Sequence, residues 1–134
     1  MKTSKQLTGE RGEQAACGFL EAGGHRILKR NWRSGHLELD IISVCGSVLH
    51  IVEVKTRSEG APVRPEFNVG PDKRRRMVRA AGEFLHSEAG SAMYFIEEVQ
   101  FDVLSVEFGD AGPIIEYYPR AFIPVYTGGS INFR

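Results

Sequence analysis

The sequence predicts a mixed α/β domain in which helices flank a central sheet. Three observations support this fold class: small and apolar residues recur at helical spacing near the N-terminus, aliphatic segments bounded by turn residues follow, and a second helical pattern precedes further aliphatic segments. The chain has 134 residues, of which 42% are hydrophobic, enough for one domain with its own core. We expect a single domain over residues 1–122 and a C-terminal extension over residues 123–134.

The order of elements follows from local signals along the chain. A helix is expected from about Ser4 to Ala22, because small and apolar residues, Phe19 among them, recur three and four positions apart until Gly23-Gly24. A strand follows at about His25–Trp32. A second helix is expected from about Pro71 to Ser87, since proline suits the first helical position. The remaining segments are an exposed loop over residues 58–69 and strands over residues 94–96, 99–108 and 114–118.

The most informative segment is a predicted hairpin that carries charges among aliphatic residues. Strands over residues 38–42 and 48–55 flank Gly46-Ser47, which suit the central positions of a type II′ turn and pair Cys45 with Val48. The same register sets two further pairs opposite each other: Asp40 with Glu53, and Glu38 with Lys55. Two carboxylates about 5 Å apart repel unless a positive group lies between them, and a divalent cation is the natural candidate.

These charged side chains suit metal-assisted hydrolysis of a phosphodiester bond. Asp40 and Glu53 supply two of the oxygen ligands that Mg²⁺ or Mn²⁺ prefers, and the main-chain carbonyl of Val54 supplies a third. Lys55 lies on the same strand face as Glu53, where its ammonium can orient the water or balance charge on the phosphate. A cross-strand salt-bridge cluster of Glu38 with Lys55 on a solvated face is the alternative that needs no metal.

Charge is distributed unevenly along the chain, although the net charge is zero. Residues 1–80 hold 15 of the 17 Lys and Arg residues and nine of the 17 Asp and Glu residues, which predicts one basic face on a neutral protein. Five of these cations crowd the first turns of the second helix, where an anionic partner would offset their unfavourable interaction with the helix dipole: Lys73, Arg74, Arg75, Arg76 and Arg79. Chance clustering on a solvated surface is the alternative.

The cysteine content and the hydropathy limit the class of protein. Cys17 and Cys45 lie in apolar surroundings without the spacing of a metal site or a disulfide framework, which favours a reducing compartment. No apolar run approaches the roughly 18 residues of a membrane span, and no hydrophobic segment follows the charges of residues 1–6. We therefore expect a cytoplasmic protein without membrane contact.

Several motifs together carry a resemblance to a known family. They are Gly12-Glu13 with Ala16, Asn31-Trp32-Arg33, Glu38-Leu39-Asp40-Ile41-Ile42, Val52-Glu53-Val54-Lys55-Thr56-Arg57, Lys73, Ala80-Ala81, Phe101-Asp102-Val103 and Ala121-Phe122. In this order, over about residues 8–122, they are similar to the largely uncharacterised bacterial YraN family, and the Asp40 and Glu53-Val54-Lys55 pattern resembles the restriction-endonuclease-like (PD-(D/E)xK) nuclease superfamily. The resemblance implies an endonuclease-like αβββαβ core and kinship in fold to archaeal Holliday-junction resolvases.

The same resemblance implies roles for individual residues. Asp40 and Glu53 match metal ligands, Lys55 matches the motif lysine, and Glu13 matches a helix carboxylate that can reach the same metal. Two positions depart from the family pattern: Leu37 stands where a glycine often precedes the Glu-x-Asp, and Gln100 stands where an arginine often precedes Phe-Asp. We expect catalytic residues at Asp40, Glu53, Lys55, Glu13 and Glu38, metal ligands at Asp40, Glu53, Glu13 and Val54, and nucleic-acid contacts at Arg33, Arg57, Lys73, Arg74 and Arg76.

The expected function is that of a Mg²⁺- or Mn²⁺-dependent nuclease that cleaves DNA, with branched DNA in repair or recombination as a candidate substrate. Cleavage of both strands ordinarily needs two sites, which favours a homodimer. The leading alternative is a nucleic-acid-binding module with a vestigial site, and a third is an oligomeric scaffold that does not bind nucleic acid. Only catalysis requires the metal, and the scaffold predicts no salt-dependent binding to DNA.

Overall fold

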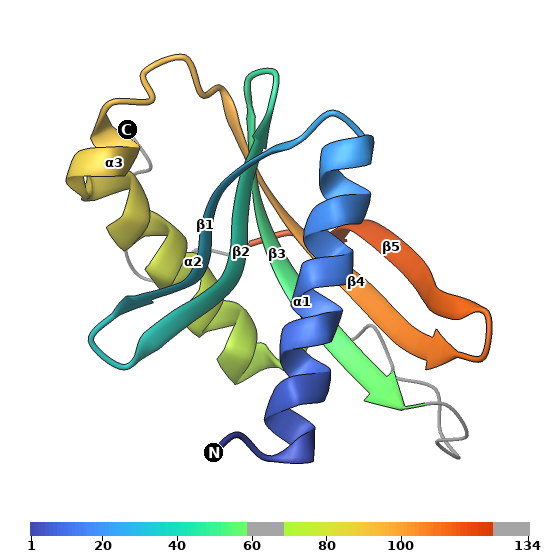
Figure 1. The fold of residues 1–134 in the computed structure, drawn as a ribbon. Helices are drawn as coiled ribbons and strands as arrows, with labels where there is room; N and C mark the ends of the chain where they lie inside the picture. Colours follow the sequence, from blue (N-terminus) through green and yellow to red (C-terminus); the bar gives the residue numbers. More distant parts are fainter. Residues whose placement is uncertain (59–68, 125–134) are drawn as a thin grey trace.

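The computed structural model describes residues 1–58 and 69–124 (Figure 1). The elements, in chain order, are α1 (Ser4–Ala22), β1 (Arg26–Ser34), β2 (Leu37–Cys45), β3 (Val48–Ser58), α2 (Pro71–His86), α3 (Glu88–Ser91), β4 (Glu98–Gly109) and β5 (Gly112–Phe122). The predicted αβββαβ order is confirmed, with one short added helix, and the strand expected over residues 114–118 forms the centre of β5. The predicted loop over residues 58–69 and the predicted extension over residues 123–134 fall almost wholly outside the described residues.

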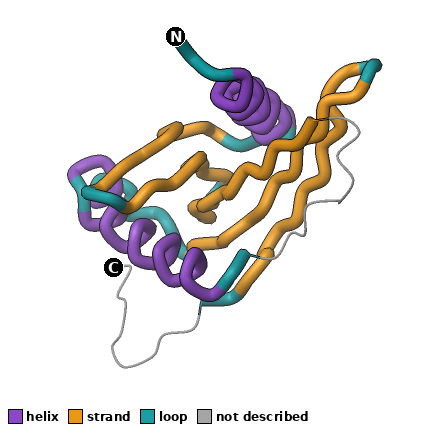
Figure 2. Tube along the Cα trace, turned by 90° about the horizontal axis from the view of Figure 1, so that it is seen from below, coloured by secondary structure: helices purple, strands orange, loops and turns teal. Residues whose placement is uncertain are grey.

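The five strands form one mixed sheet in the order β1-β2-β3-β4-β5. Neighbours are antiparallel except β3 and β4, which are parallel from Val48–Glu98 to Ser58–Phe108. A parallel pair needs a crossover connection, and α2 lies within the segment that joins β3 to β4. Figure 2 shows α1 on one face of the sheet and α2 on the other, so the predicted mixed α/β class is confirmed.

Each face of the sheet has its own apolar core. On the α1 face, Ala16, Cys17 and Leu20 pack against Ile41 and Val52, and the two strand residues are almost completely buried. The core on the α2 face is larger and is built from buried residues of α2, β2, β3 and β4, with Trp32 of β1 packed edge-on against Phe84. The central strands are therefore covered on both sides, which is why their sequences are aliphatic throughout.

Some local predictions were wrong. Residues 94–96 form no strand: Tyr94 is 86% exposed, and the Ile96 amide donates to the Met93 carbonyl in a turn. The exposed aromatic ring thus reflects a surface turn and not a pleated, half-buried segment. Phe19 is 40% exposed and does not belong to the buried stripe of α1, where Cys17 takes the corresponding place.

The hairpin between β2 and β3 has the predicted register over its first half. Cys45 pairs with Val48, Gly46 has a φ of +61°, and Ser47 is not in the positive-φ region, as a type II′ turn requires. The ladder runs from there only as far as Ile41 and Val52. The predicted pairs Asp40–Glu53 and Glu38–Lys55 lie beyond its end, because β2 separates from β3 at that point and continues with β1 alone.

No helix in residues 1–58 or 69–124 is both long and apolar enough to cross a membrane.

Candidate active site

The predicted site lies where β2 leaves β3. We call this point the fork and define it by Asp40 on β2 and by Glu53 and Val54 on β3. In Figure 1 the far end of the β1–β2 hairpin turns away from β3 below the fork. On the β1 side, Asn31 falls between the pairs Arg30–Ile41 and Trp32–Leu39 and has a φ of +49°. This left-handed residue directly opposite Asp40 gives a local cause for the change in strand direction.

The burial pattern of β2 changes at the same place. Ile42 and Val44 pack in the core on the α2 face, as do Leu39 and Leu37, although alternation would put these pairs on opposite faces. Ile41, between them, packs in the core on the α1 face. The two-stranded ribbon beyond the fork is therefore rotated relative to the sheet, and Asp40 lies at the pivot.

The Asp40 side chain takes the place of a main-chain acceptor where the β2–β3 ladder ends. Its Oδ2 accepts the main-chain N–H of Val54 at 2.9 Å, so the first amide of β3 past the ladder on this edge keeps a partner. The Asp40 carboxyl also hydrogen-bonds the Glu53 side chain. Burial first, and then the charge of Glu53 and this hydrogen bond, raise the pKa of Asp40 to about 8. Two carboxyl groups that influence each other in this way lie close together in a poorly solvated place.

Glu53 is 7% exposed and forms an ion pair with Lys73 in the first turns of α2. The ammonium of Lys73 compensates a carboxylate that is otherwise costly to bury. Lys55 follows two positions later on β3 and so projects from the same face as Glu53. The structure thus brings together Asp40, Glu53 and Lys73. Lys55 is the next residue of β3 on the same face as Glu53.

Glu13 approaches the fork from α1 because Gly12 lets the helix come close to β3. A Cβ at Gly12 would lie 2.1 Å from Oγ1 of Thr56, so only glycine fits there. Burial raises the pKa of Glu13, while Arg30 and a hydrogen bond with Asn31 act against that rise. Its Oε1 is buried and has no hydrogen-bond partner among the described residues. The charge of Glu13 also contributes to the raised pKa of Asp40.

The donor set fits a hard divalent cation. Asp40 and Glu53 offer convergent carboxyl oxygens, and Oε1 of Glu13 is a buried acceptor without a hydrogen-bond partner among the described residues. Because the N–H of Val54 points at Asp40, its carbonyl lies on the same edge of β3, at the fork. No group of three or more His, Cys, Asp or Glu side chains within residues 1–58 and 69–124 is already arranged around one metal position. A metal would therefore draw Glu13 towards the other two.

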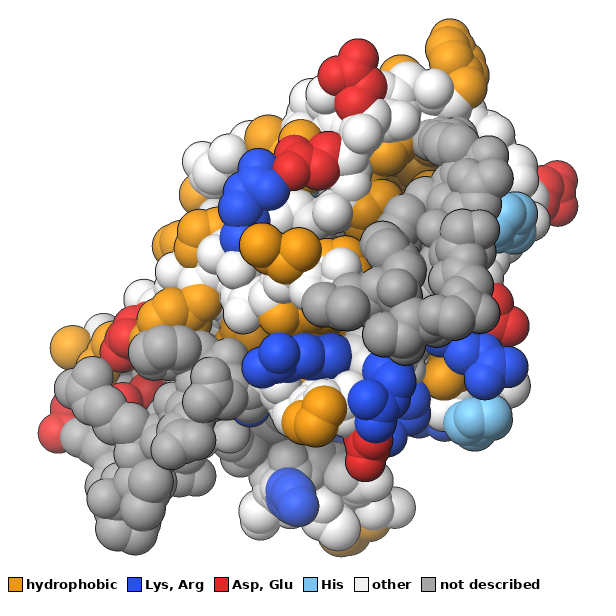
Figure 3. Space-filling model, turned by 180° about the vertical axis from the view of Figure 1, so that it is seen from behind, with side chains coloured by type: hydrophobic (Ala, Val, Ile, Leu, Met, Phe, Trp, Pro, Cys, Tyr) orange, Lys and Arg blue, Asp and Glu red, His pale blue; other side chains and the backbone are white. Residues whose placement is uncertain are grey.

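The remaining predicted residues lie around this centre. Glu38 does not share the ladder with Lys55 but pairs with Arg33 across the β1–β2 ribbon, at 3.5 Å between Nη2 and Oε2. Arg74 donates to the Val69 carbonyl at 2.5 Å, and Arg76 is exposed. Arg57 lies past Lys55 near the end of β3. Figure 3, which views the face covered by α2, shows Lys and Arg side chains gathered in the lower half of the view.

Asn31 is the residue that sequence reasoning did not single out for this site. The sequence shows it only as part of the Asn31-Trp32-Arg33 motif. In the structure its backbone shapes the fork and its side chain hydrogen-bonds the carboxylate of Glu13. A signal was present, because asparagine is the residue, after glycine, that most readily adopts left-handed backbone angles. Asparagine inside a predicted strand therefore marks a possible break in the ladder.

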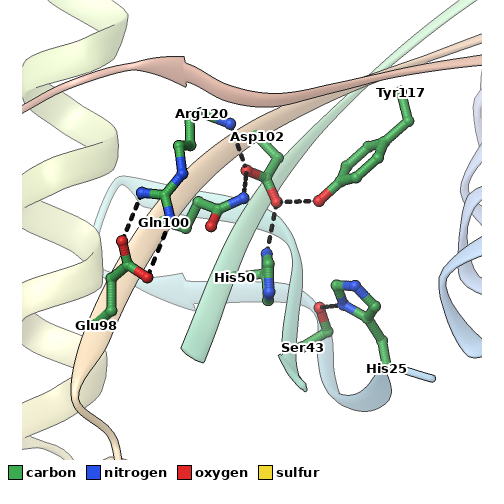
Figure 4. Close-up of polar contacts among 8 residues, drawn as sticks. All are labelled: His25, Ser43, His50, Glu98, Gln100, Asp102, Tyr117 and Arg120. Carbon is green, nitrogen blue, oxygen red and sulfur yellow. Dashed lines mark hydrogen bonds and ion pairs between the residues drawn. The ribbon is translucent and has the colours of Figure 1, made fainter. Parts of the chain in front are cut away.

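Asp102, the carboxylate of the Phe101-Asp102-Val103 motif, belongs to a separate cluster (Figure 4). It is completely buried and accepts hydrogen bonds from His50 Nδ1 at 2.7 Å, Gln100 Nε2 at 2.9 Å, the Arg120 amide at 3.0 Å and the Tyr117 hydroxyl. Burial would raise the pKa of Asp102, but these hydrogen bonds outweigh it and hold the pKa below its usual value. With every donor directed at one carboxylate, the cluster joins β3, β4 and β5, and Asp102 engages the side-chain amide of Gln100.

Comparison with known proteins identifies the relatives of this chain. A model of the uncharacterised protein family UPF0102 matches residues 12–106. UPF0102 proteins of Anaeromyxobacter dehalogenans and Bacteroides fragilis are 41% and 42% identical over 118 and 120 residues, covering 88% of this chain and 85% and 93% of those relatives. The UPF0102 protein of Nitratidesulfovibrio vulgaris is 37% identical over 136 residues, covering 100% of this chain and 98% of the relative.

Among solved structures, Pyrococcus furiosus SfsA in complex with Ca²⁺ is similar at 17% identity and a TM-score of 0.40. The match covers 86% of this chain and 63% of that protein, less than two thirds of its length. A TM-score this low carries no argument about this chain.

Proposed function

This chain belongs to the UPF0102 family of uncharacterised proteins, the YraN-type family that its motifs resemble, and from that premise we propose that it is a divalent-metal-dependent nuclease that hydrolyses phosphodiester bonds in DNA. The observation that carries the proposal is the pair of carboxyl groups at the fork. Asp40 and Glu53 lie together in a poorly solvated place, where burial and the charge of Glu53 raise the pKa of Asp40 to about 8. Such a pair is costly without a cation and favourable with one, which is the property expected of a metal site.

The residues that would hold the cation are Asp40, Glu53, the main-chain carbonyl of Val54 and, after a side-chain movement, Glu13. A bound Mg²⁺ or Mn²⁺ supplies positive charge at the scissile phosphate and at the attacking water. Oxygen donors of this kind suit these two metals better than softer ones.

The chain's own residues supply the rest of the chemistry. Lys55, on the face of β3 that carries Glu53, can orient the water and balance negative charge that develops on the phosphate. Lys73 is paired with Glu53 and neutralises that carboxylate, and its ammonium could also pair with a phosphate oxygen of the substrate. The exposed cations of α2 then contact flanking phosphates and fix the strand in place.

The test is cleavage of supercoiled plasmid and of a branched DNA in Mg²⁺, in Mn²⁺ and in a chelator. We expect nicking that depends on the metal and that falls by about 100-fold or more in Asp40→Asn, Glu53→Gln and Lys55→Met. Asp110→Asn, at an exposed position in the turn between β4 and β5, removes the same charge far from the fork and serves as the matched control. Metal-independent nicking, or equal nicking by Asp40→Asn and the control, would contradict the proposal.

A second candidate function is that of a nucleic-acid-binding module whose vestigial site does not catalyse cleavage. The observation that favours it is the Lys73–Glu53 ion pair, because the ammonium occupies the side of Glu53 where a metal would compete. In that case Lys73→Met should restore calorimetric heat on Mn²⁺ addition that the wild type lacks, and the wild type should bind DNA without cutting it. If the wild type already binds Mn²⁺ and cuts, this candidate is excluded.

A further inference from the structure

Past the fork, no strand among the described residues pairs with one edge of β3. The β2–β3 ladder ends at Ile41–Val52, while β3 continues to Ser58 with β4 on its other side. The first amide on the open edge, that of Val54, is taken by Asp40. Main-chain groups alternate sides along a strand, so the N–H and carbonyl of Thr56 lie on this same open edge.

A groove runs beside this edge, between β3 and the N-terminal turns of α1. It has a volume of about 530 Å³ and is lined by Ser4, Lys5, Thr8, Gly9, Val54 and Thr56. Val54 also belongs to the fork, but its side chain packs on the α1 face of the sheet, whereas Glu53 and Lys55 project from the α2 face. The groove therefore lies beside the fork on the α1 face. Its size is in the range of about 300–1,000 Å³ that accommodates small ligands, and far too small for a duplex.

The lining offers hydrogen-bond donors and a positive charge. Lys5 has no ion pair with any residue in the described part of the chain, whereas the neighbouring Lys2 pairs with Glu10. The hydroxyls of Ser4 and Thr56 are further donors, while Thr8 already donates to the Ser4 carbonyl at 2.9 Å. Neither a carboxylate nor an aromatic ring appears among the described lining residues. This chemistry suits phosphate and sugar, and it does not suit stacking against bases.

We propose that this groove binds the phosphate backbone of one nucleic-acid strand next to the cleavage position, with Lys5 and Thr56 as its phosphate contacts. The inference rests on the proposed nuclease function and specifies its substrate: the strand beside the cut is single-stranded, as at a flap, a frayed end or a branch. Its position supports this occupant, because the groove shares Val54 with the fork and Glu13 approaches the fork from the same α1 face. A strand bound at the fork on this face lies next to the groove. A continuous duplex could not place one of its strands there without opening.

Two pairs of matched variants test the groove. Lys5→Ala removes the groove cation, and Lys29→Ala removes the same charge from an exposed position on β1. Gly9→Leu fills the groove, because a Cβ at Gly9 meets nothing within 4 Å, and Gly18→Leu places the same side chain at an equally open position elsewhere on α1. Thermal melting of each variant checks that the fold is intact.

The measurement is fluorescence anisotropy with a labelled oligothymidine about ten nucleotides long, and with a blunt duplex of the same length, in a chelator over a range of salt. We expect Lys5→Ala and Gly9→Leu to weaken single-strand binding by about three- to tenfold, and Lys5→Ala to lower the slope of log affinity against log salt by about 0.7. The two control variants should match the wild type, and duplex binding should change less.

The outcomes separate this inference from the proposed function. If Lys5→Ala and Gly9→Leu bind the oligonucleotide like the wild type, or weaken single strand and duplex alike, or if the wild type does not bind the oligonucleotide, the groove proposal is wrong. These results come from a chelated, inactive protein, so they do not depend on cleavage. Conversely, groove variants that weaken binding in a protein that never cuts DNA would support the groove and overturn the nuclease.

Discussion

Replacing Asp40 by asparagine should change how the stability of the metal-free protein depends on pH. Asparagine reproduces the protonated carboxyl: its oxygen can accept the Val54 amide and its NH₂ group can donate to Glu53, as the wild-type contacts require. What the variant cannot do is lose a proton. The difference between the two proteins therefore isolates the ionisation of one side chain.

The size and sign of the effect follow from the raised pKa of Asp40. Burial and Glu53 raise this pKa from 3.8 to about 8, so between these values the folded protein holds a proton that the unfolded chain has released. The free energy of unfolding then falls as pH rises, by about 1.4 kcal/mol per pH unit. From about pH 5 to about pH 7, the wild type should lose about 3 kcal/mol relative to Asp40→Asn, a large part of a typical stability of about 5–15 kcal/mol.

The assay is urea denaturation at several pH values in a chelator, with the wild type, Asp40→Asn and the control Asp110→Asn. The control should keep the wild-type pH dependence, because Asp110 is exposed. Adding Mn²⁺ to the wild type near pH 7 should release about one proton, which calorimetry in two buffers of different ionisation enthalpy detects. A constant stability difference between wild type and Asp40→Asn across this range would show that the carboxyl pair is not formed.

Three further substitutions test the packing around the two carboxylate clusters. Gly12→Ala should destabilise the protein by about 1–3 kcal/mol in denaturant, because its Cβ would lie 2.1 Å from the Thr56 hydroxyl, whereas Gly9→Ala should be neutral or slightly stabilising. Equal effects of the two glycine substitutions would contradict the close approach. Asp102→Ala should cost about 3–5 kcal/mol by leaving its buried donors unpaired. Tyr117→Phe should cost about 2 kcal/mol, and a loss near zero would show that its hydroxyl bond to Asp102 contributes nothing.

The parts of the fold that sequence could predict are those with strong local signals. The first helix has the predicted bounds, Ser4–Ala22, because a period of small and apolar residues and a double glycine define it without help from distant contacts. The register next to Gly46-Ser47 was also predictable, since a two-residue turn with glycine first leaves few choices. The charged strand ends could also be predicted, because charged residues directly after an aliphatic segment are a strong local signal.

The parts that could not be predicted depend on residues far apart in the chain. The hairpin register does not extend past Ile41, where the left-handed backbone of Asn31 opposite Asp40 combines with a distant contact, the packing of the β1–β2 ribbon against α2 through Trp32 and Phe84. The donors around Asp102 come from three strands, and only the folded sheet brings them together. The roles of the residues at the fork remain proposals that the metal and cleavage experiments address.

The rotated β1–β2 ribbon beyond the fork restricts the number of residues in this segment more than it restricts their identity. Within residues 31–40, the side chains of Leu37 and Leu39 must point into the core, and that of Glu38 must point to solvent on the opposite side of the ribbon. A single insertion or deletion here would exchange inside for outside along the whole ribbon tip, a far larger penalty than most substitutions. This stretch should therefore accept many side-chain changes in an engineered library yet reject the insertion or deletion of a single residue.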